Sequence, residues 1–348
     1  MSAWRNVKTH CGYTSRWMEL LPMPRFGLSV TRPDLQVQNP AALNFDFMKI
    51  ENSIGWCDDT TNAVTGCAKV SPGCKNCYAE VGMRARVLRD QGVETWGPKG
   101  VRHPVAGFAA KLRRLNKLCV CSGCHQSYPA SELARMANGY PLCASCSSPL
   151  RRIRLFADSN SDWLDEAWPV ETLASFLEAI RLAPNLDVIL LTKRMENFQK
   201  RLGQAYTAAG NTGLEIWIDR WTEGMEAPAN VWLGVSVEDQ KRADERIPLL
   251  LQTPAAVRFL SVEPLLERIS LRHLLGFKNA DGTEIGWAII GSESGPNRRD
   301  CGVQAIVDVA EQCRAAGVPC YVKQDCHRLP GQQGRIPDEI WARKEFPQ

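Results

Sequence analysis

The 348-residue sequence contains no apolar run that approaches the ~20 residues needed to cross a bilayer. Its first eight residues, Met1 to Lys8, also lack the apolar core of a secretory signal peptide. We therefore expect neither a spanning helix nor a cleaved leader of the usual kind. We therefore expect a globular protein that works in the cytoplasm, without a membrane partner.

The first part of the chain lacks a pattern typical of regular structure. Residues 1–47 show no sustained helical or strand periodicity, which predicts a poorly ordered N-terminal extension. An alternative is that the functional chain begins at Met48, directly before the segment in which ordered patterns start.

Acidic residues are scarce in one stretch of the chain. Between Arg84 and Arg154 there are thirteen lysines and arginines but only three acids, a net charge of +10 in a protein whose total is +4. Such an excess is typical of a phosphate-binding surface, so we expect DNA or RNA contacts from Arg113, Arg114, Arg151 and Arg152. The alternative is a solvated surface whose arginines pair with acids elsewhere in the fold.

Cysteine is abundant, with fourteen residues. Disulfide-rich scaffolds are small secreted domains, whereas this chain is long and its cysteines have the spacing of metal ligands. We therefore interpret them as reduced thiols in a reducing compartment.

Three cysteines lie on one short segment. Cys67, Cys74 and Cys77 are separated by six and then two residues, and Pro72-Gly73 allows a sharp turn between them. Three thiolates can hold three irons of a [4Fe–4S] cluster and leave the fourth iron open to a ligand. The apolar spacing from Tyr78 onward predicts a helix that starts just after the last thiol.

A second cysteine group has the spacing of a zinc ribbon. Two Cys-x-x-Cys pairs, separated by eighteen residues, supply Cys121, Cys124, Cys143 and Cys146. We predict that residues 119–150 form a zinc-ribbon-like insertion that binds Zn²⁺ and contacts nucleic acid. Cys119 and His125 are alternative ligands, and an iron–sulfur cluster is an alternative occupant.

From about residue 150 short apolar runs alternate with helix-like stretches such as Val170–Leu182 and Val303–Ala316. The runs predict strands at Ile153–Ala157, Val188–Leu191, Val231–Val235, Val257–Leu260, Trp287–Ile290 and Cys320–Val322. With one strand before the three-cysteine loop, this pattern predicts an α/β fold, a complete or partial (β/α) barrel of parallel strands. Its expected parts are 48–118 with the three-cysteine loop, the insertion 119–150, the remaining barrel 151–330, and a C-terminal tail 331–348.

Polar residues follow nearly every predicted strand, which places an active face at the strand C-termini. The candidates for cofactor or substrate binding are Asn160, Ser161, Asp162, Lys193, Arg194, Glu238, Glu263, Glu293 and Lys323. Asn160, Ser161 and Asp162 are expected to bind amino and ribose hydroxyl groups, and Lys193 with Arg194 a carboxylate. The alternatives are helix N-caps and ion pairs across the barrel mouth.

The segment Ile54–Glu80, with its Cys-x6-Cys-x2-Cys motif, resembles a phage-associated family of uncharacterised proteins with a radical-SAM-like three-cysteine motif. Further matching segments extend the resemblance from about residue 50 to 326: Leu191–Arg194, Val231–Glu238, Phe259–Pro264, Gly291–Gly295 and Val322–Gln324. The family has no settled reaction to carry over.

The chain departs from the usual radical-SAM loop, which has three residues between its first two cysteines and an aromatic residue before the last. Here six residues separate Cys67 from Cys74, and Asn76 precedes Cys77. The insertion and residues 1–47 lie outside the family pattern. Cys57 is an additional thiol, which raises the alternative of a closed four-cysteine zinc site.

The leading hypothesis is a radical S-adenosylmethionine enzyme. Its reduced [4Fe–4S] cluster, supplied by an electron donor, would cleave S-adenosylmethionine to a 5′-deoxyadenosyl radical that acts on a nucleic-acid base or nucleotide. One alternative is a non-catalytic zinc-bound nucleic-acid-binding or adaptor protein with two four-cysteine sites. Another is the same chemistry on a peptide or small molecule.

Overall fold

The computed structural model describes residues 49–347, apart from 139–140, 211, 225 and 276–283. The predicted extension 1–47 lies outside these residues.

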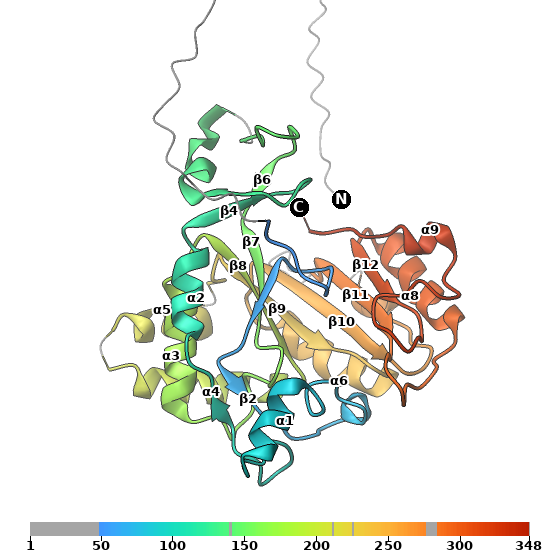
Figure 1. Ribbon diagram of the computed structural model, residues 1–348, viewed down its shortest axis with the longest axis horizontal. Coiled ribbons are helices and arrows are strands. Elements are labelled where there is room, and N and C mark those ends of the chain that lie inside the picture. Colours follow the sequence, from blue (N-terminus) through green and yellow to red (C-terminus); the bar gives the residue numbers. More distant parts are fainter. Residues whose placement is uncertain (1–48, 139–140, 211, 225, 276–283, 348) are drawn as a thin grey trace, which may run out of the picture. The chain divides into compact units, whose positions relative to one another are not determined.

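Seven parallel strands form one curled sheet, in the order in which they follow one another along the chain (Figure 1). They are β1 (Asp59–Thr61), β7 (Ile153–Ala157), β8 (Leu186–Thr192), β9 (Val231–Ser236), β10 (Val257–Leu265), β11 (Trp287–Ser292) and β12 (Cys320–Gln324). Within the described part of the chain β1 and β12 do not pair with each other. The predicted barrel is therefore a half-barrel.

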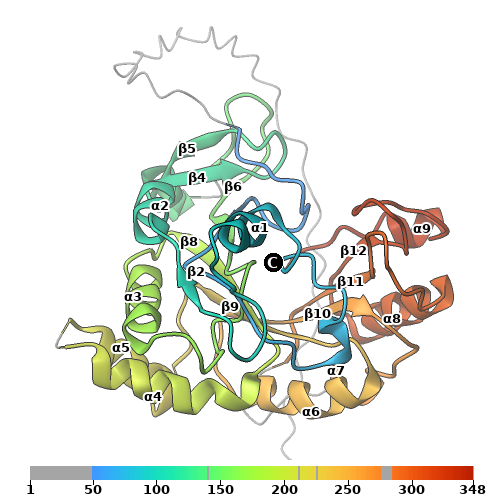
Figure 2. The same ribbon diagram turned by 60° about the horizontal axis from the view of Figure 1, so that its bottom comes forward.

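Most helices lie in an arc on the outside of this sheet, as Figure 2 shows for α2, α3, α4, α6 and α8. The α-helices are α1 (Met83–Asp90), α2 (Phe108–Leu115), α3 (Val170–Arg181), α4 (Phe198–Ala208), α5 (Leu214–Thr222), α6 (Gln240–Leu251), α7 (Arg272–Leu275), α8 (Val303–Ala316) and α9 (Asp338–Trp341). Short 3₁₀ helices are η1 (Pro72–Cys74), η2 (Ala130–Asn138) and η3 (Met195–Asn197).

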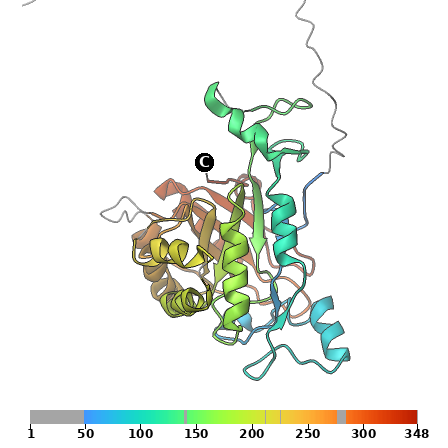
Figure 3. The same cartoon turned by 90° about the vertical axis from the view of Figure 1, so that its left-hand side faces the viewer.

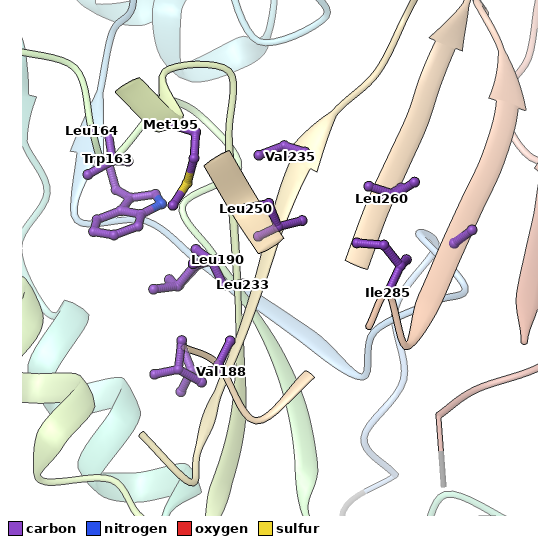
Figure 4. Close-up of a cluster of buried hydrophobic side chains, with 14 of the residues drawn as sticks. Trp163, Leu164, Val188, Leu190, Met195, Leu233, Val235, Leu250, Leu260 and Ile285 are labelled. Atoms are coloured by element: carbon purple, nitrogen blue, oxygen red, sulfur yellow. The ribbon is translucent and has the colours of Figure 1, made fainter. Parts of the chain in front are cut away.

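The alternation of side chains along each strand builds two separate cores. Val188 and Leu190 of β8 point outward and pack under the helices, together with Leu233, Leu260 and the other residues of Figure 4. Because both faces of the sheet are covered, its central strands are apolar at nearly every position, and all residues of β9 and β11 are buried.

The inner core, on the other face of the sheet, is rich in aromatic residues. It contains Trp56, Phe156, Trp232, Phe259 and Trp287. A Cβ atom at Gly234 of β9 would lie only 2.4 Å from the Phe259 ring, so this strand position has room for glycine alone. The C-terminal segment joins this core, because Phe346 stacks on Trp287 with 5.6 Å between ring centroids.

The predicted insertion corresponds to a small antiparallel sheet in the order β5-β4-β6. Its strands are β4 (Leu118–Cys121), β5 (Ser127–Pro129) and β6 (Leu150–Arg151); β2 (Val64–Thr65) and β3 (His103–Pro104) form a separate pair. Figures 1 and 3 place this module at one end of the half-barrel and α1 at the opposite end, where the strands finish.

The helix expected directly after Cys77 begins later, at Met83, because residues 78–82 form turns first. Its buried residues are Ala85 and Leu88, whereas Val81, Met83 and Val87 are exposed. None of the described helices combines the length and apolarity that crossing a membrane requires.

Candidate functional site at the ends of the parallel strands

The polar strand ends meet in a cavity of about 240 Å³. Cys67, Cys74 and Cys77 all line it. Eight of the nine residues predicted from strand ends line it as well, namely Asn160, Ser161, Asp162, Lys193, Arg194, Glu263, Glu293 and Lys323. The topology thus brings the three thiols and the strand-end groups to one place. The ninth residue, Glu238, does not line the cavity.

Glu238 instead supports the three-cysteine loop from below. Its side chain is fully buried and forms an ion pair with Arg246 at 2.8 Å. Its other carboxylate oxygen accepts a hydrogen bond from the backbone N–H of Gly73 at 3.4 Å. A Cβ atom at position 73 would lie 3.0 Å from this carboxylate, so glycine is what lets the loop approach it. Glu238 is therefore a positioning residue for the thiols.

Arg194 also holds the loop. Its guanidinium donates a 3.0 Å hydrogen bond to the carbonyl of Ala68 and lies 3.9 Å from the Cys67 sulfur. Asp162 and Asp165 lie 3.6 and 3.4 Å from the same guanidinium. The Asp162 carboxylate additionally accepts hydrogen bonds from the Thr192 hydroxyl and the Lys193 N–H. The expected pairing of Arg194 with a ligand carboxylate thus competes with these internal partners.

Asn76, which directly precedes Cys77, also holds the loop. Its amide donates to the Glu293 carboxylate at 2.9 Å and to the Asn297 carbonyl at 2.7 Å. Arg299 binds the same carboxylate at 2.6 Å. Burial by itself raises the pKa of Glu293, but the hydrogen bonds from Arg299 and Asn76 outweigh it and hold the pKa below its usual value.

The three thiols are spaced too widely for a single ion. Four sulfurs around one zinc lie about 3.8 Å apart, given a Zn–S distance of about 2.3 Å. In the described part of the chain, no three of Cys57, Cys67, Cys74 and Cys77 come within 4.8 Å of one another. Cys57 lies in the inner core and accepts a hydrogen bond from Asn52. These four cysteines therefore do not form the compact set that a closed zinc site needs.

The partly buried thiol of Cys67 is a poor nucleophile without a metal. Burial raises the pKa of Cys67 to about 12, and the pKa of Cys57 to a similar value. A thiol of this pKa is protonated at neutral pH, whereas nucleophilic attack needs the thiolate. The geometry therefore does not support free-thiol catalysis at Cys67.

Two charged groups that line the cavity have no oppositely charged partner among the described residues. The Lys193 ammonium donates only to the Ser236 hydroxyl, at 3.0 Å. Asp158 is 4% exposed, and one of its oxygens accepts from the N–H groups of Ala63 and Val64, both at 2.9 Å. Its other oxygen is buried without a hydrogen bond. Burial raises the pKa of Asp158 to about 7. By contrast, Lys323 pairs with Glu263 at 3.1 Å.

The second cysteine group forms a compact cluster that could hold a metal ion. The sulfurs of Cys121, Cys124, Cys143 and Cys146 all lie within 4.8 Å of one another. The N–H groups of Gly123 and Cys124 point at the Cys121 sulfur, and the N–H of Ser145 at the Cys143 sulfur. The Tyr128 hydroxyl, 3.1 Å from Cys143, lowers the pKa of that thiol to about 6.

The two alternative ligands of this module lie outside the cluster. Cys119 is fully buried and donates to the carbonyl of Pro129. His125 lies 4.0 Å from Asp58. Among the described residues, the group that could hold a metal ion therefore consists of the four cysteines of the paired motif.

The four predicted nucleic-acid arginines differ in their environment. Arg151 binds both oxygens of the buried Asp58, at 2.6 and 2.9 Å, and thereby fastens the module to β1 and β7. Arg152 hydrogen-bonds to the Ala229 carbonyl and lies 3.7 Å from Asp187. Arg113 and Arg114 are exposed, with no ion pair in the described part of the chain. Arg151 therefore pairs with an acid elsewhere in the fold, as the alternative interpretation of the basic stretch predicts.

A family model covers residues 51–337, which includes the three-cysteine loop, the module and every strand end of the cavity. The chain belongs to the DUF5131 family of proteins of unknown function. No curated protein and no solved structure gives a significant match. The membership agrees with the predicted resemblance to an uncharacterised family; the phage association and the radical-SAM motif stay predictions.

In this DUF5131 protein the residue that the sequence analysis missed is Asp158. It directly follows β7 and precedes the predicted group Asn160, Ser161 and Asp162. Its place at a strand end could have singled it out. The sequence could not predict that one of its oxygens lacks a hydrogen bond, because that atom becomes buried only in the folded protein.

Proposed function

We propose that this protein is a radical S-adenosylmethionine enzyme whose Cys67, Cys74 and Cys77 hold a [4Fe–4S] cluster. The observation that carries the proposal is that these three thiols line one cavity without forming the compact set that a single ion needs, and that no other described cysteine lines it. When bound, the reduced cluster and S-adenosylmethionine would supply the 5′-deoxyadenosyl radical.

Under this proposal the residues around the cavity have two kinds of role. Glu238, Arg194 and Asn76 hold the loop and set the positions of the thiols through the contacts described above. Lys193 and Asp158 are the candidates to bind the cofactor, because neither has an opposite charge beside it among the described residues. The unpaired oxygen of Asp158 is buried, so this side chain would have to turn toward the cavity to reach a ligand. The ammonium of Lys193 suits the methionine carboxylate, and the Asp158 oxygen suits a donor such as the methionine amino group.

The aromatic inner core beneath the cavity excludes water from one side of the site. The paired Glu263 and Lys323, together with Asn160 and Ser161, offer polar contacts for the ribose or the substrate. We propose a nucleic-acid base or nucleotide as the substrate, which the exposed Arg113 and Arg114 of α2, without an ion pair to a described residue, support.

We propose Zn²⁺ as the ion of the four-cysteine module. Four thiolates in a compact tetrahedral set are the ligands of a structural zinc site. The module lies at the end of the sheet opposite α1, and Arg151 joins it to Asp58 of the half-barrel. Its role under this proposal is to stabilise the fold near β1 and β7.

The test combines metal analysis with product detection. Protein purified without oxygen should contain about four irons and one zinc per chain. Cys67→Ala should remove iron and keep zinc, Cys121→Ser should do the reverse, and Cys57→Ala should keep both. Reduced protein incubated with S-adenosylmethionine should release 5′-deoxyadenosine. Colourless protein with zinc in place of iron at the three-cysteine loop would overturn the proposal.

The substrate class needs a separate measurement. Affinity for an oligonucleotide should fall steeply with salt concentration and drop when Arg113 and Arg114 are replaced by Gln. Binding that is absent, or independent of salt, would remove the nucleic-acid proposal while leaving the cofactor proposal intact.

A further inference from the structure

Helix α1 and the turn before it present an unusual amount of apolar surface to solvent. Val81, Met83 and Val87 are 66%, 74% and 48% exposed. Of the eleven large apolar or aromatic side chains that are exposed in the described part of the chain, six lie between residues 70 and 101. Contiguous exposed apolar surface of this kind marks interaction sites.

The buried side of the same helix faces the thiols. Ala85 of α1 packs in a small cluster with Ala79 and Trp96, against which Cys67 and Cys77 also pack. Through Ala85, α1 therefore lies next to the side chains that pack on Cys67 and Cys77, and the loop itself is partly exposed.

Two arginines with no ion pair to a described residue lie on the same helix as the exposed apolar residues. Arg84 and Arg86 are exposed and make no ion pair with a described residue, whereas Arg89 pairs with Glu94. An apolar centre with a charged rim is typical of a protein interface, and a positive rim attracts an acidic partner.

We propose that Val81, Met83 and Val87, with Arg84 and Arg86, form the docking surface of an acidic electron-carrier protein that holds a flavin or an iron–sulfur centre. The inference rests on the proposed function. In the transfer, the carrier loses one electron and the group held by Cys67, Cys74 and Cys77 gains it, with no other reactant.

The composition of the surface favours a protein over a nucleic acid. Its centre is aliphatic, whereas interfaces with nucleic acid are polar and use aromatic rings for base stacking. The exposed ring beside it, Tyr78, has its hydroxyl tied to the Ser159 carbonyl at 2.9 Å.

The experiment compares two reductants on the cluster-loaded protein. With reduced flavodoxin, which is acidic, Arg84→Glu/Arg86→Glu should lower the rate of 5′-deoxyadenosine release by about tenfold or more, because opposite charges that steer encounter become like charges. With dithionite, a small reductant that needs no docking surface, the variant should match the wild type. Met83→Ser should lower only the flavodoxin-driven rate, and added salt should narrow the difference between variant and wild type. The matched control is Arg220→Glu/Arg272→Glu, which changes two exposed arginines on α5 and α7 and should leave both rates unchanged.

Direct binding of flavodoxin, followed by titration, tests the surface even if no product forms. Wild-type affinity in Arg84→Glu/Arg86→Glu would overturn the docking proposal, as would an equal loss of rate with both reductants. Loss of oligonucleotide affinity instead of flavodoxin affinity would assign the surface to nucleic acid and likewise overturn it. Absence of product from the wild type with dithionite would contradict the proposed function, and the titration would still report on the surface.

Discussion

Asp158→Asn should make the protein more stable at neutral pH while it weakens ligand binding. Asparagine keeps the shape of the side chain, and its carbonyl oxygen can accept the hydrogen bonds from Ala63 and Val64 that one Asp158 oxygen accepts now. The change removes the ionisation of a buried carboxyl whose second oxygen lacks a hydrogen bond.

The magnitude follows from the pKa of Asp158, which burial raises from 3.8 to about 7. At 1.36 kcal/mol per pKa unit, this shift of roughly three units corresponds to about 4 kcal/mol. Below pH ~4 the carboxyl is protonated in both the folded and the unfolded chain, so ionisation costs no stability. As the pH rises toward 7 the unfolded chain loses the proton first, and the folded state loses stability until the cost is complete above the folded pKa.

The assay is urea unfolding at several pH values, with wild type and variant in the same metal state. The stability advantage of Asp158→Asn should grow from near zero at pH ~4 to about 4 kcal/mol at pH ~8. Asp165→Asn is the contrasting control, because it breaks the buried ion pair with Arg102 and should destabilise the protein at neutral pH. An advantage that does not change with pH would refute the argument.

Ligand binding supplies the second readout for the same variant. If Asp158 accepts a hydrogen bond from a cationic ligand group, its replacement costs about 1.5–3 kcal/mol, or roughly 10- to 140-fold in affinity for S-adenosylmethionine. Unchanged affinity would exclude Asp158 from the binding site.

Three further predictions concern the loop, the basic residues and the module. Gly73→Ala should lower the iron content, because its Cβ would press on the carboxylate beneath the loop, whereas Gly203→Ala, with open space at its Cβ position, should keep the iron. Arg151→Ala should cost about 3–5 kcal/mol in unfolding experiments, because it leaves a buried carboxylate unpaired, while Arg113→Ala should change stability by less than about 0.5 kcal/mol. Removing the ion of the four-cysteine module with a chelator should lower the melting temperature in a calorimetric scan but should leave the iron of the other loop in place; a coupled loss of both metals would show that the two sites are not independent.

Several elements were predictable because their signal is local. The strands appear where β-branched and apolar runs stand between turn signals, and β7 has the predicted bounds, Ile153–Ala157. The helix at Val303–Ala316 also has its predicted bounds. The four-cysteine cluster was predictable for the same reason, since two Cys-x-x-Cys turns carry their own geometry.

Other predictions failed or stayed open because they depend on contacts between distant segments. Glu238 and Glu293 both follow strands, yet one is fully buried beneath the thiol loop and the other lines the cavity. The sequence does not distinguish Arg151 from the other arginines of the basic stretch. Only the tertiary structure brings it, at the end of β6, into contact with Asp58, directly before β1. The apolar residues after Cys77 have helical spacing, but the pattern does not say that part of them faces solvent.

The amino-acid sequence by itself determined the order of strands and helices, the parallel sheet that this order requires, and the two cysteine groups, because each is encoded by neighbours along the chain. Only the tertiary structure decided that the sheet stops at a half-barrel, that three thiols and eight strand-end residues share one cavity, and that Asp158 keeps an unpartnered oxygen there. The physical reason is that burial and electrostatic pairing depend on which distant segments come into contact. The sequence pattern of a single strand does not specify those contacts.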